Sequence, residues 1–402
     1  MMVPYASVIL STLNRSSTLP YALASVQGQS EKRLEIFLVL DGATPACREI
    51  AFAAAREDAR IRIFDLAKDS GRGEFNVDFA LSQCSSERIF YIDDDDLWLT
   101  HHVARLGPLL DHADVADSRV CSVDRAGALH LGPSRGANAR IRALLGTARL
   151  KTLYDTHMAH RKDAYGRYAT WFSHPETGYA VWGLMAGFAN NPECRWVSCD
   201  EVTALSIHGA ARPDMSPEAR TKEIAHWAAQ IGARDAALDV ALARADCIFH
   251  LFRLLMTDPP QGGTLDDYLA LRGGYGEDFS NRPERDLFAL FTPSPPAEPA
   301  AITLACALSE AVEAGSLFEA ITLAYFNAYG QSGHERILLA AARRDGANPA
   351  YRLAAYSVAV CRRDVPAALA LARDALSLGP DPIGSLARWE NTLARLAATP
   401  AG

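Results

Sequence analysis

Short apolar runs alternate with segments of helical spacing along residues 6–98, and this alternation constrains the fold more than any other feature. The runs have the length and composition of strands, and they cover residues 6–12, 34–40, 60–65 and 88–92. Helical spacing separates them at about residues 19–29 and 76–84. Strands joined by helical crossovers lie parallel in one sheet with helices on both faces. The first part of the chain is therefore predicted to have an α/β fold.

The second part of the chain has a different pattern. From about residue 217 onward, almost every periodic segment is helical and rich in alanine and leucine. We expect an α/β domain over residues 1–215 and an all-α helical domain over residues 216–402, with a Pro- and Gly-rich connector at about 257–299. Helical hairpins are expected over about 300–395, and they resemble tetratricopeptide-type pairs. A chain of 402 residues is long enough for two or three such cores.

The composition excludes several classes of protein. A formal net charge of -8 argues against a nucleic-acid-binding protein, which would carry a basic face. No apolar stretch reaches the roughly 18 residues of a membrane-spanning helix, and the start of the chain lacks the basic region of a signal peptide. The eight cysteines are scattered without a Cys-x-x-Cys pair, so we expect a reducing, cytoplasmic environment and no cysteine metal site. The 35 arginines against 5 lysines are typical of a high-GC bacterial genome.

Four consecutive aspartates, Asp93 to Asp96, directly follow the apolar run at residues 88–92. We expect them at the carboxyl end of a strand, where open α/β sheets bind ligands. Four adjacent like charges are costly unless a cation neutralises them. Carboxylate oxygens suit Mg²⁺ or Mn²⁺, which can in turn hold a diphosphate. A solvated acidic turn is the alternative interpretation.

Two further polar motifs follow predicted strands. STLNR at residues 11–15 comes directly after the first apolar run, and LVLDGAT at residues 38–44 places Asp41 at the end of the second. Polar residues after strands are common, so each motif alone is weak. Their order and their spacing ahead of the aspartates favour one shared binding edge.

Taken together, these motifs resemble those of family 2 glycosyltransferases with the GT-A fold. The family's Thr-x-Asn element reads STLNR here, its Val-Asp-Asp-Gly-Ser element reads VLDGA, and its Asp-x-Asp element reads DDDD. The resemblance covers about residues 5–210 and is most specific at its N-terminal end. It implies a nucleotide-diphospho-sugar transferase with a Rossmann-like, mostly parallel sheet, a UDP-sugar as donor, and Mn²⁺ or Mg²⁺ as cofactor.

The resemblance also assigns residues to the donor site. Thr12 and Asn14 would line the nucleoside pocket, and Asp41 would accept a hydrogen bond from the base. Asp93 and Asp94 would face the ribose and the first phosphate.

Three further assignments complete the donor site. Asp95 would hold the metal, and His208, which follows the last predicted strand, would complete the metal site or touch the diphosphate. Arg72 would lie near the base. A solvent-facing loop arginine and a structural histidine are the alternative interpretations of Arg72 and His208.

The acceptor half departs from the family pattern. The family carries Glu-Asp at the start of a helix and a tryptophan farther on, and residues 174–184 read HPETGYAVWGL, which aligns Glu176 and Trp182 but replaces the aspartate by Thr177. Since that aspartate is the family's usual catalytic base, Glu176 is expected to take its role. It would otherwise be a helix N-terminal acid favoured by the helix dipole. The spacing does not select any of the nearby histidines as an acceptor contact: His157, His160 and His174.

The predicted function is transfer of a sugar from a nucleoside diphosphate to a hydroxyl or other nucleophile on a glycan, peptide or protein, with inversion. The helical domain would present a surface for the acceptor or for a homodimer. A nucleotidyltransferase on a similar sheet is one alternative, but residues 11–17 lack the Gly-rich basic signature that it would need. A non-catalytic nucleotide-binding scaffold is the other, and Thr177 favours it.

Overall fold

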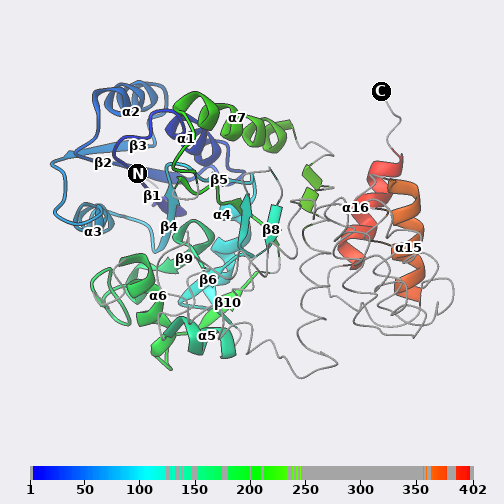
Figure 1. Ribbon diagram of the computed structural model, residues 1–402. Coiled ribbons are helices and arrows are strands. Elements are labelled where there is room, and N and C mark those ends of the chain that lie inside the picture. The colour runs from blue at the N-terminus through cyan, green and yellow to red at the C-terminus, as the bar shows by residue number, and fades with distance from the viewer. Residues whose placement is uncertain are drawn as a thin grey trace, which may run out of the picture. The chain divides into compact units, whose positions relative to one another are not determined.

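The computed structural model divides the chain into two compact units, residues 1–234 and 235–402 (Figure 1). We describe each unit by itself. The residues that the structure describes in the first unit are 3–123, 127, 129–131, 136–137, 139–146, 153–173, 180–199, 201–209 and 212–233. In the second unit they are 238–239, 241–242, 245, 356, 359, 364–377 and 386–398.

A seven-stranded sheet forms the centre of the first unit, in the order β10-β6-β9-β4-β1-β2-β3. β9 runs antiparallel to both of its neighbours, and every other adjacent pair in this sheet is parallel. The strands are β1 (Ala6–Thr12), β2 (Leu34–Asp41), β3 (Ile61–Leu66), β4 (Arg88–Asp93), β6 (Val115–Asp117), β9 (Met158–Arg161) and β10 (Trp196–Ser198). The predicted mostly parallel sheet is therefore confirmed.

Helices cover both faces of this sheet, which explains why its central strands read as continuous apolar runs. α1 (Leu19–Gln27) and α2 (Pro45–Glu57) pack into the cluster that contains Val8 and Leu10 of β1. α3 (Glu74–Ser82) contacts β1 and β2 and lies on the other side of the sheet from α2 (Figure 1). All eight residues of β2 are buried as a result.

Smaller elements complete the first unit. β5 (Leu97–Trp98) pairs with β11 (Ala204–Leu205), and β7 (Cys121–Val123) pairs with β8 (Leu129–Leu131). Because β5 follows the aspartates directly, its pairing with β11 brings residues 206–209 to the acidic run. The remaining short helices are α4 (His102–Leu106), η1 (Gly107–Asp111), α5 (Ala139–Gly146), η2 (Asp155–His157), η3 (Lys162–Ala164) and α6 (Ala180–Asn190).

Helix α7 (Pro217–Ala233) belongs to the first unit, although the sequence placed it at the start of the helical domain. It buries Ile224 and Trp227 and contacts α1. The Thr221 hydroxyl also donates to the Ser17 carbonyl at 3.3 Å. These contacts move the boundary from the expected residue 215 to Arg234.

Two long helices are described in the second unit, α15 (Val365–Ser377) and α16 (Leu386–Ala398). They lie side by side (Figure 1), and Arg373 pairs with Glu390 at 2.7 Å. α15 falls within the expected span of about 300–395, and α16 extends three residues beyond it, in agreement with a helical C-terminal part. The expected connector at 257–299 and the hairpins before residue 356 lie outside the described residues. Among the described helices, none is long and apolar enough to cross a bilayer.

Candidate active site

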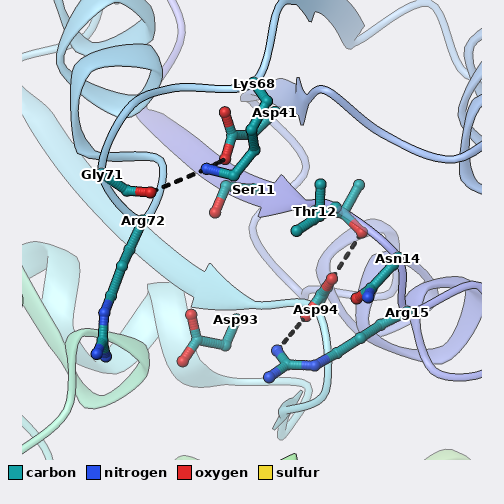
Figure 2. A pocket seen from close by; sticks show the side chains of 11 residues that line it. Ser11, Thr12, Asn14, Arg15, Asp41, Lys68, Gly71, Arg72, Asp93 and Asp94 are labelled. Carbon is teal, nitrogen blue, oxygen red and sulfur yellow. Dashed lines mark hydrogen bonds and ion pairs between the residues drawn. The ribbon is translucent and has the colours of Figure 1, made fainter.

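A cavity of about 330 Å³ opens at the carboxyl ends of β1, β2 and β4 (Figure 2). In the sheet, β1 lies between β2 and β4, so the order of the strands changes direction at β1. Ligands bind open α/β sheets at such a point. The cavity is lined by Ser11, Thr12, Leu13, Asn14, Arg15, Asp41, Lys68, Gly71, Arg72, Asp93 and Asp94. The structure thus brings together six residues that the sequence assigned to donor binding: Thr12, Asn14, Asp41, Arg72, Asp93 and Asp94.

Asp94 is held from two sides by residues of the STLNR motif. The Thr12 hydroxyl donates to Asp94 Oδ2 at 2.6 Å, and Arg15 Nη1 donates to Asp94 Oδ1 at the same distance. Asp94 itself is buried, whereas the Arg15 side chain is 45% exposed and faces the cavity. Burial disfavours the Arg15 cation, but the carboxylates of Asp95 and Asp94 outweigh it and raise the pKa of Arg15. Arg15 is therefore a permanent positive charge in the cavity wall.

Asp41 closes β2 and accepts three hydrogen bonds. Lys68 Nζ donates to its Oδ2 at 2.7 Å, and the Asp69 amide and Asn76 Nδ2 each donate to its Oδ1 at 2.7 Å. The chain passes close by at Gly73, whose φ is +108° and whose added Cβ would lie 3.2 Å from Asp41 Oδ2. A glycine suits this position because other residues rarely adopt such a φ.

Lys68 also organises the loop that carries Arg72. Its Nζ donates to the carbonyl oxygens of Asp69 and Gly71, both at 3.0 Å. The Arg72 amide donates to Glu74 Oε2 at 2.6 Å, at the start of α3. In Figure 2 the Arg72 side chain extends from this loop along the cavity. The loop thus joins Asp41 to the beginning of α3.

Asp95 and Asp96 turn away from the cavity toward the segment after β11. The Gly209 amide donates to Asp95 Oδ2 at 2.7 Å, and Arg220 Nη2 lies 3.3 Å from the same oxygen. Asp96 accepts from the Ile207 amide at 2.8 Å and from the Ser206 hydroxyl at 3.2 Å. These bonds explain how residues more than a hundred positions later are fixed beside the aspartates.

The acidic cluster includes a residue that the motifs did not identify, Asp155. Burial and the nearby Asp96 carboxyl raise the pKa of Asp155 to about 6, and burial and Asp95 raise the pKa of Asp96 to about 7. Burial, then Asp155 and Asp96, hold the pKa of Asp93 well above its usual range. Asp155 lies in a segment rich in histidine and aromatic residues, where no motif surrounds it. No motif surrounds Arg220 in α7 either, and Lys68 lies in a loop without periodicity.

His208 lies next to this cluster. Its Nε2 is buried and has no hydrogen-bond partner within the described residues, and its ring is 4.2 Å from that of Tyr154. Burial lowers the pKa of His208, so the imidazole is neutral at neutral pH, the form that binds metals.

The donor set fits a divalent cation by its chemistry. An imidazole nitrogen that is unpartnered within the described residues stands beside Asp95 and Asp155, and carboxylate oxygens suit Mg²⁺ or Mn²⁺. In the described part of the chain, however, no three His, Cys, Asp or Glu side chains converge in metal-binding geometry. The Asp95 oxygens instead contact Arg15, Arg220 and the Gly209 amide.

The acceptor side is described only in part. Glu176, Thr177 and His174 lie outside the described residues. His157 and His160 are buried and hydrogen-bonded, to Ser206 at 2.9 Å and to Tyr91 at 2.9 Å, so neither lines the cavity.

Residues 7–128 match the family model described as Glycosyl transferase family 2. These residues form a family 2 glycosyltransferase domain. The match includes every residue that lines the cavity, and it confirms the resemblance for this part of the expected span of 5–210.

Two curated relatives resemble the family 2 domain. An uncharacterized glycosyltransferase, alr2836, from Nostoc sp. is 29% identical over 131 residues, which cover 30% of this chain and 40% of that protein. A GalNAc(5)-diNAcBac-PP-undecaprenol beta-1,3-glucosyltransferase from Campylobacter jejuni is 30% identical over 131 residues, which cover 32% of this chain and 41% of that protein. The chain thus spans about two fifths of the length of these relatives.

Two solved structures align with about nine tenths of the chain, at low identity and low TM-score. S. aureus TarS 1-349 in complex with UDP-GlcNAc has a TM-score of 0.42 and 16% identity, over 90% of this chain and 92% of that one. The mannosyltransferase PcManGT from Pyrobaculum calidifontis, in complex with GDP-Man and Mn²⁺, has a TM-score of 0.39 and 14% identity, over 92% of this chain and 88% of that one.

Proposed function

We propose that this chain is a glycosyltransferase that moves a sugar from a UDP-sugar to an acceptor nucleophile with inversion of configuration. The observation that carries the proposal is the cavity itself: five side chains from three separate motifs, together with Arg72, line one space at the strand ends. That space lies within the residues that match family 2.

The nucleotide occupies this cavity. Asp41 accepts a hydrogen bond from the base, Arg72 lies beside the base, and Thr12 and Asn14 line the nucleoside pocket. Asp93 and Asp94 face the ribose and the first phosphate. Arg15, which carries a permanent charge in the same wall, favours an anionic ligand.

Asp95 and His208 are the residues that would hold Mn²⁺ or Mg²⁺. The bound cation supplies Lewis-acid stabilisation of the charge on the leaving diphosphate. His208 suits this role because its Nε2 is buried, neutral and unpartnered within the described residues.

Glu176 acts as the base on the acceptor. The acceptor oxygen forms a bond to the anomeric carbon from the face opposite the diphosphate, and the bond from that carbon to the diphosphate oxygen breaks. Glu176 takes the acceptor proton, and the nucleoside diphosphate leaves with the electron pair.

The acceptor belongs to a glycan, a peptide or a protein, and the helical part of the chain presents a surface for it or for a second copy. We assign the reaction to the cytoplasm, because the described cysteines are free thiols and four of the five are buried.

Titration of UDP into the protein, with and without Mn²⁺, tests the donor site, and hydrolysis of a panel of UDP-sugars tests the chemistry. We expect micromolar binding that needs Mn²⁺ and slow donor hydrolysis. Glu176→Gln should keep the UDP affinity and lower transfer by about 10²–10⁴-fold. Failure to bind UDP, GDP and dTDP would refute the proposal. Nucleotide binding without hydrolysis or transfer would favour a non-catalytic scaffold, which Thr177 already suggests.

A further inference from the structure

Three exposed phenylalanines gather near the donor cavity. Phe75 and Phe79 of α3 are 57% and 44% exposed, and Phe172, from the segment after β9, is 40% exposed. The rings of Phe75 and Phe172 lie 4.7 Å apart with an interplanar angle of 31°. We call Phe75 and Phe172 the aromatic pair. Clustered apolar rings at a surface are typical of a binding site, because a ligand that covers them removes apolar surface from water, which is favourable.

Phe75 is attached to the wall of the donor cavity through one residue. Its amide donates to Asp69 Oδ2 at 2.9 Å, and the Asp69 amide donates to Asp41 Oδ1 at 2.7 Å. Gly71 and Arg72, which line the cavity, lie between Asp69 and Phe75 in the chain. The Phe75 backbone is therefore fixed to the same hydrogen-bonded loop that supplies Gly71 and Arg72 to the cavity lining.

Phe172 is held from the strand that carries the aspartates. Its neighbour Trp171 packs edge-on against Tyr91 of β4, with the ring centroids 5.1 Å apart. The Tyr165 hydroxyl donates to Asp78 and so ties the segment after β9 to α3. The aromatic pair thus joins the two sides of the site, one ring from each.

We propose that the aromatic pair stacks against a sugar ring of the acceptor. The inference rests on the proposed function and adds to it that the acceptor is a carbohydrate. A pyranose presents a face of C–H groups, which packs on an aromatic ring, and a rim of hydroxyls, which carboxylates bind. Glu74 and Asp78 of α3 supply carboxylates next to Phe75.

The surroundings of the pair favour a sugar over other occupants. Arg72 and Arg167 flank α3 and residues 168–173 in the sequence, which is fewer basic residues than the cluster of about four to eight that binds an anionic lipid surface. A specific contact with a second protein copy needs about 800 Å² on each partner. Two half-exposed rings supply far less, which matches the size of one or two sugar rings.

The test compares glycan binding by the full chain and by matched variants. The probe is an array of printed mono- to pentasaccharides, read in the presence of UDP and Mn²⁺. We expect Phe75→Ala, Phe75→Leu and Phe172→Ala each to lose about tenfold in apparent affinity, and Phe75→Trp to retain it. Phe52→Ala is the control, since Phe52 is 44% exposed on α2 and should have no effect. UDP titrations should be unchanged in all five variants.

Several outcomes would overturn this assignment. The role of the aromatic pair would be rejected by wild-type protein that binds UDP but no printed glycan. It would also be rejected by variants that bind glycans as well as wild type does, or by an equal loss in Phe52→Ala. Each of these results leaves the donor proposal intact. Binding to vesicles of phosphatidylcholine and phosphatidylglycerol that Phe75→Leu retains would reject it in favour of a membrane surface. Failure of wild-type protein to bind UDP in the titration rejects the donor proposal. A loss of glycan binding that is confined to the Phe75 and Phe172 variants, with UDP affinity unchanged, concerns the aromatic pair alone.

Discussion

Arg220 of α7 reaches back to Asp95 in the acidic run, with Nη2 and Oδ2 3.3 Å apart. The same guanidinium donates to the Ile207 carbonyl at 2.7 Å and pairs with Glu223 at 2.7 Å. Both Arg220 and Asp95 are largely buried. A single side chain therefore ties the strand end that carries the aspartates, the segment after β11 and helix α7.

Replacing Arg220 should destabilise the first unit. Arg220→Met leaves the buried Asp95 with the half-exposed Arg15 as its remaining cation and leaves Glu223 with Arg212 alone, and we expect a loss of about 3 kcal/mol in the free energy of unfolding. Urea denaturation of the full chain measures this loss. Arg105→Ala is the matched control, because the Arg105–Glu201 pair is half-exposed and should cost less than about 1 kcal/mol. Equal losses in the two variants would show that the Arg220 network contributes no more than a surface ion pair.

Thr12→Val should weaken nucleotide binding while leaving the fold intact. The substitution keeps the shape of the side chain and removes the 2.6 Å hydrogen bond to Asp94. Asp94 is then held by Arg15 alone, and an Asp94 carboxylate that is less well positioned in the cavity wall should lower the UDP affinity on the order of tenfold, about 1.4 kcal/mol. Calorimetric titration gives the value. Ser82→Ala, which removes a hydroxyl at the end of α3 far from the cavity lining, should leave the affinity unchanged; a fall of similar size there would contradict the assignment.

Removal of the Lys68 cation should also lower UDP affinity. Lys68→Met deletes three hydrogen bonds, to Asp41 and to the carbonyls of Asp69 and Gly71, and frees the loop that carries Arg72. We expect a loss on the order of tenfold in affinity with little change in the unfolding midpoint, because the Lys68 side chain is 41% exposed. Lys32→Met, at an exposed position outside the cavity lining, serves as the control. An unchanged titration curve for Lys68→Met would remove this loop from the binding site.

Acid should destabilise the first unit through two buried histidines. Burial lowers the pKa of His157 to about 3 and that of His160 to about 4, below the value of 6.5 that applies when the chain is unfolded. The unfolded state therefore binds protons first, and the stability present above pH 6.5 is lost as the pH falls toward 4. The expected contribution is on the order of 1–2 kcal/mol for each histidine between pH 6.5 and 5.

The carboxyls with raised pKa values act in the opposite direction, so the test is a difference between proteins. Urea unfolding of wild type and His160→Gln at pH 7 and pH 5 should show a smaller pH effect in the variant. His112→Gln, at an exposed position, should behave like wild type. Identical pH effects in wild type and His160→Gln would mean that His160 is charged in the folded protein.

The sequence predicted which residues of these motifs meet at one edge of the sheet, because those residues follow local rules. Thr12, Asp41 and Asp93 each stand at the end of an apolar strand, and parallel strands bring such ends to one edge of the sheet. Contacts that depend on the path of the chain between elements were not predictable in this way. Asp155 lies in η2, directly before the antiparallel strand β9, and Arg220 lies in a helix whose apolar positions look like those of any helical domain.

Helix α7 also limits how this protein can be divided or recombined. The segment that matches the family ends at residue 128, and the motif pattern ends near His208, yet the unit continues to Arg234. A chain cut at residue 215 would lose Arg220, one of the partners of Asp95, and uncover the surface on α1 that α7 contacts. Gene fusions that exchange the C-terminal helices should therefore keep α7 with the transferase unit. The smallest segment that can be exchanged as a unit is longer than the part of the sequence that carries recognisable motifs.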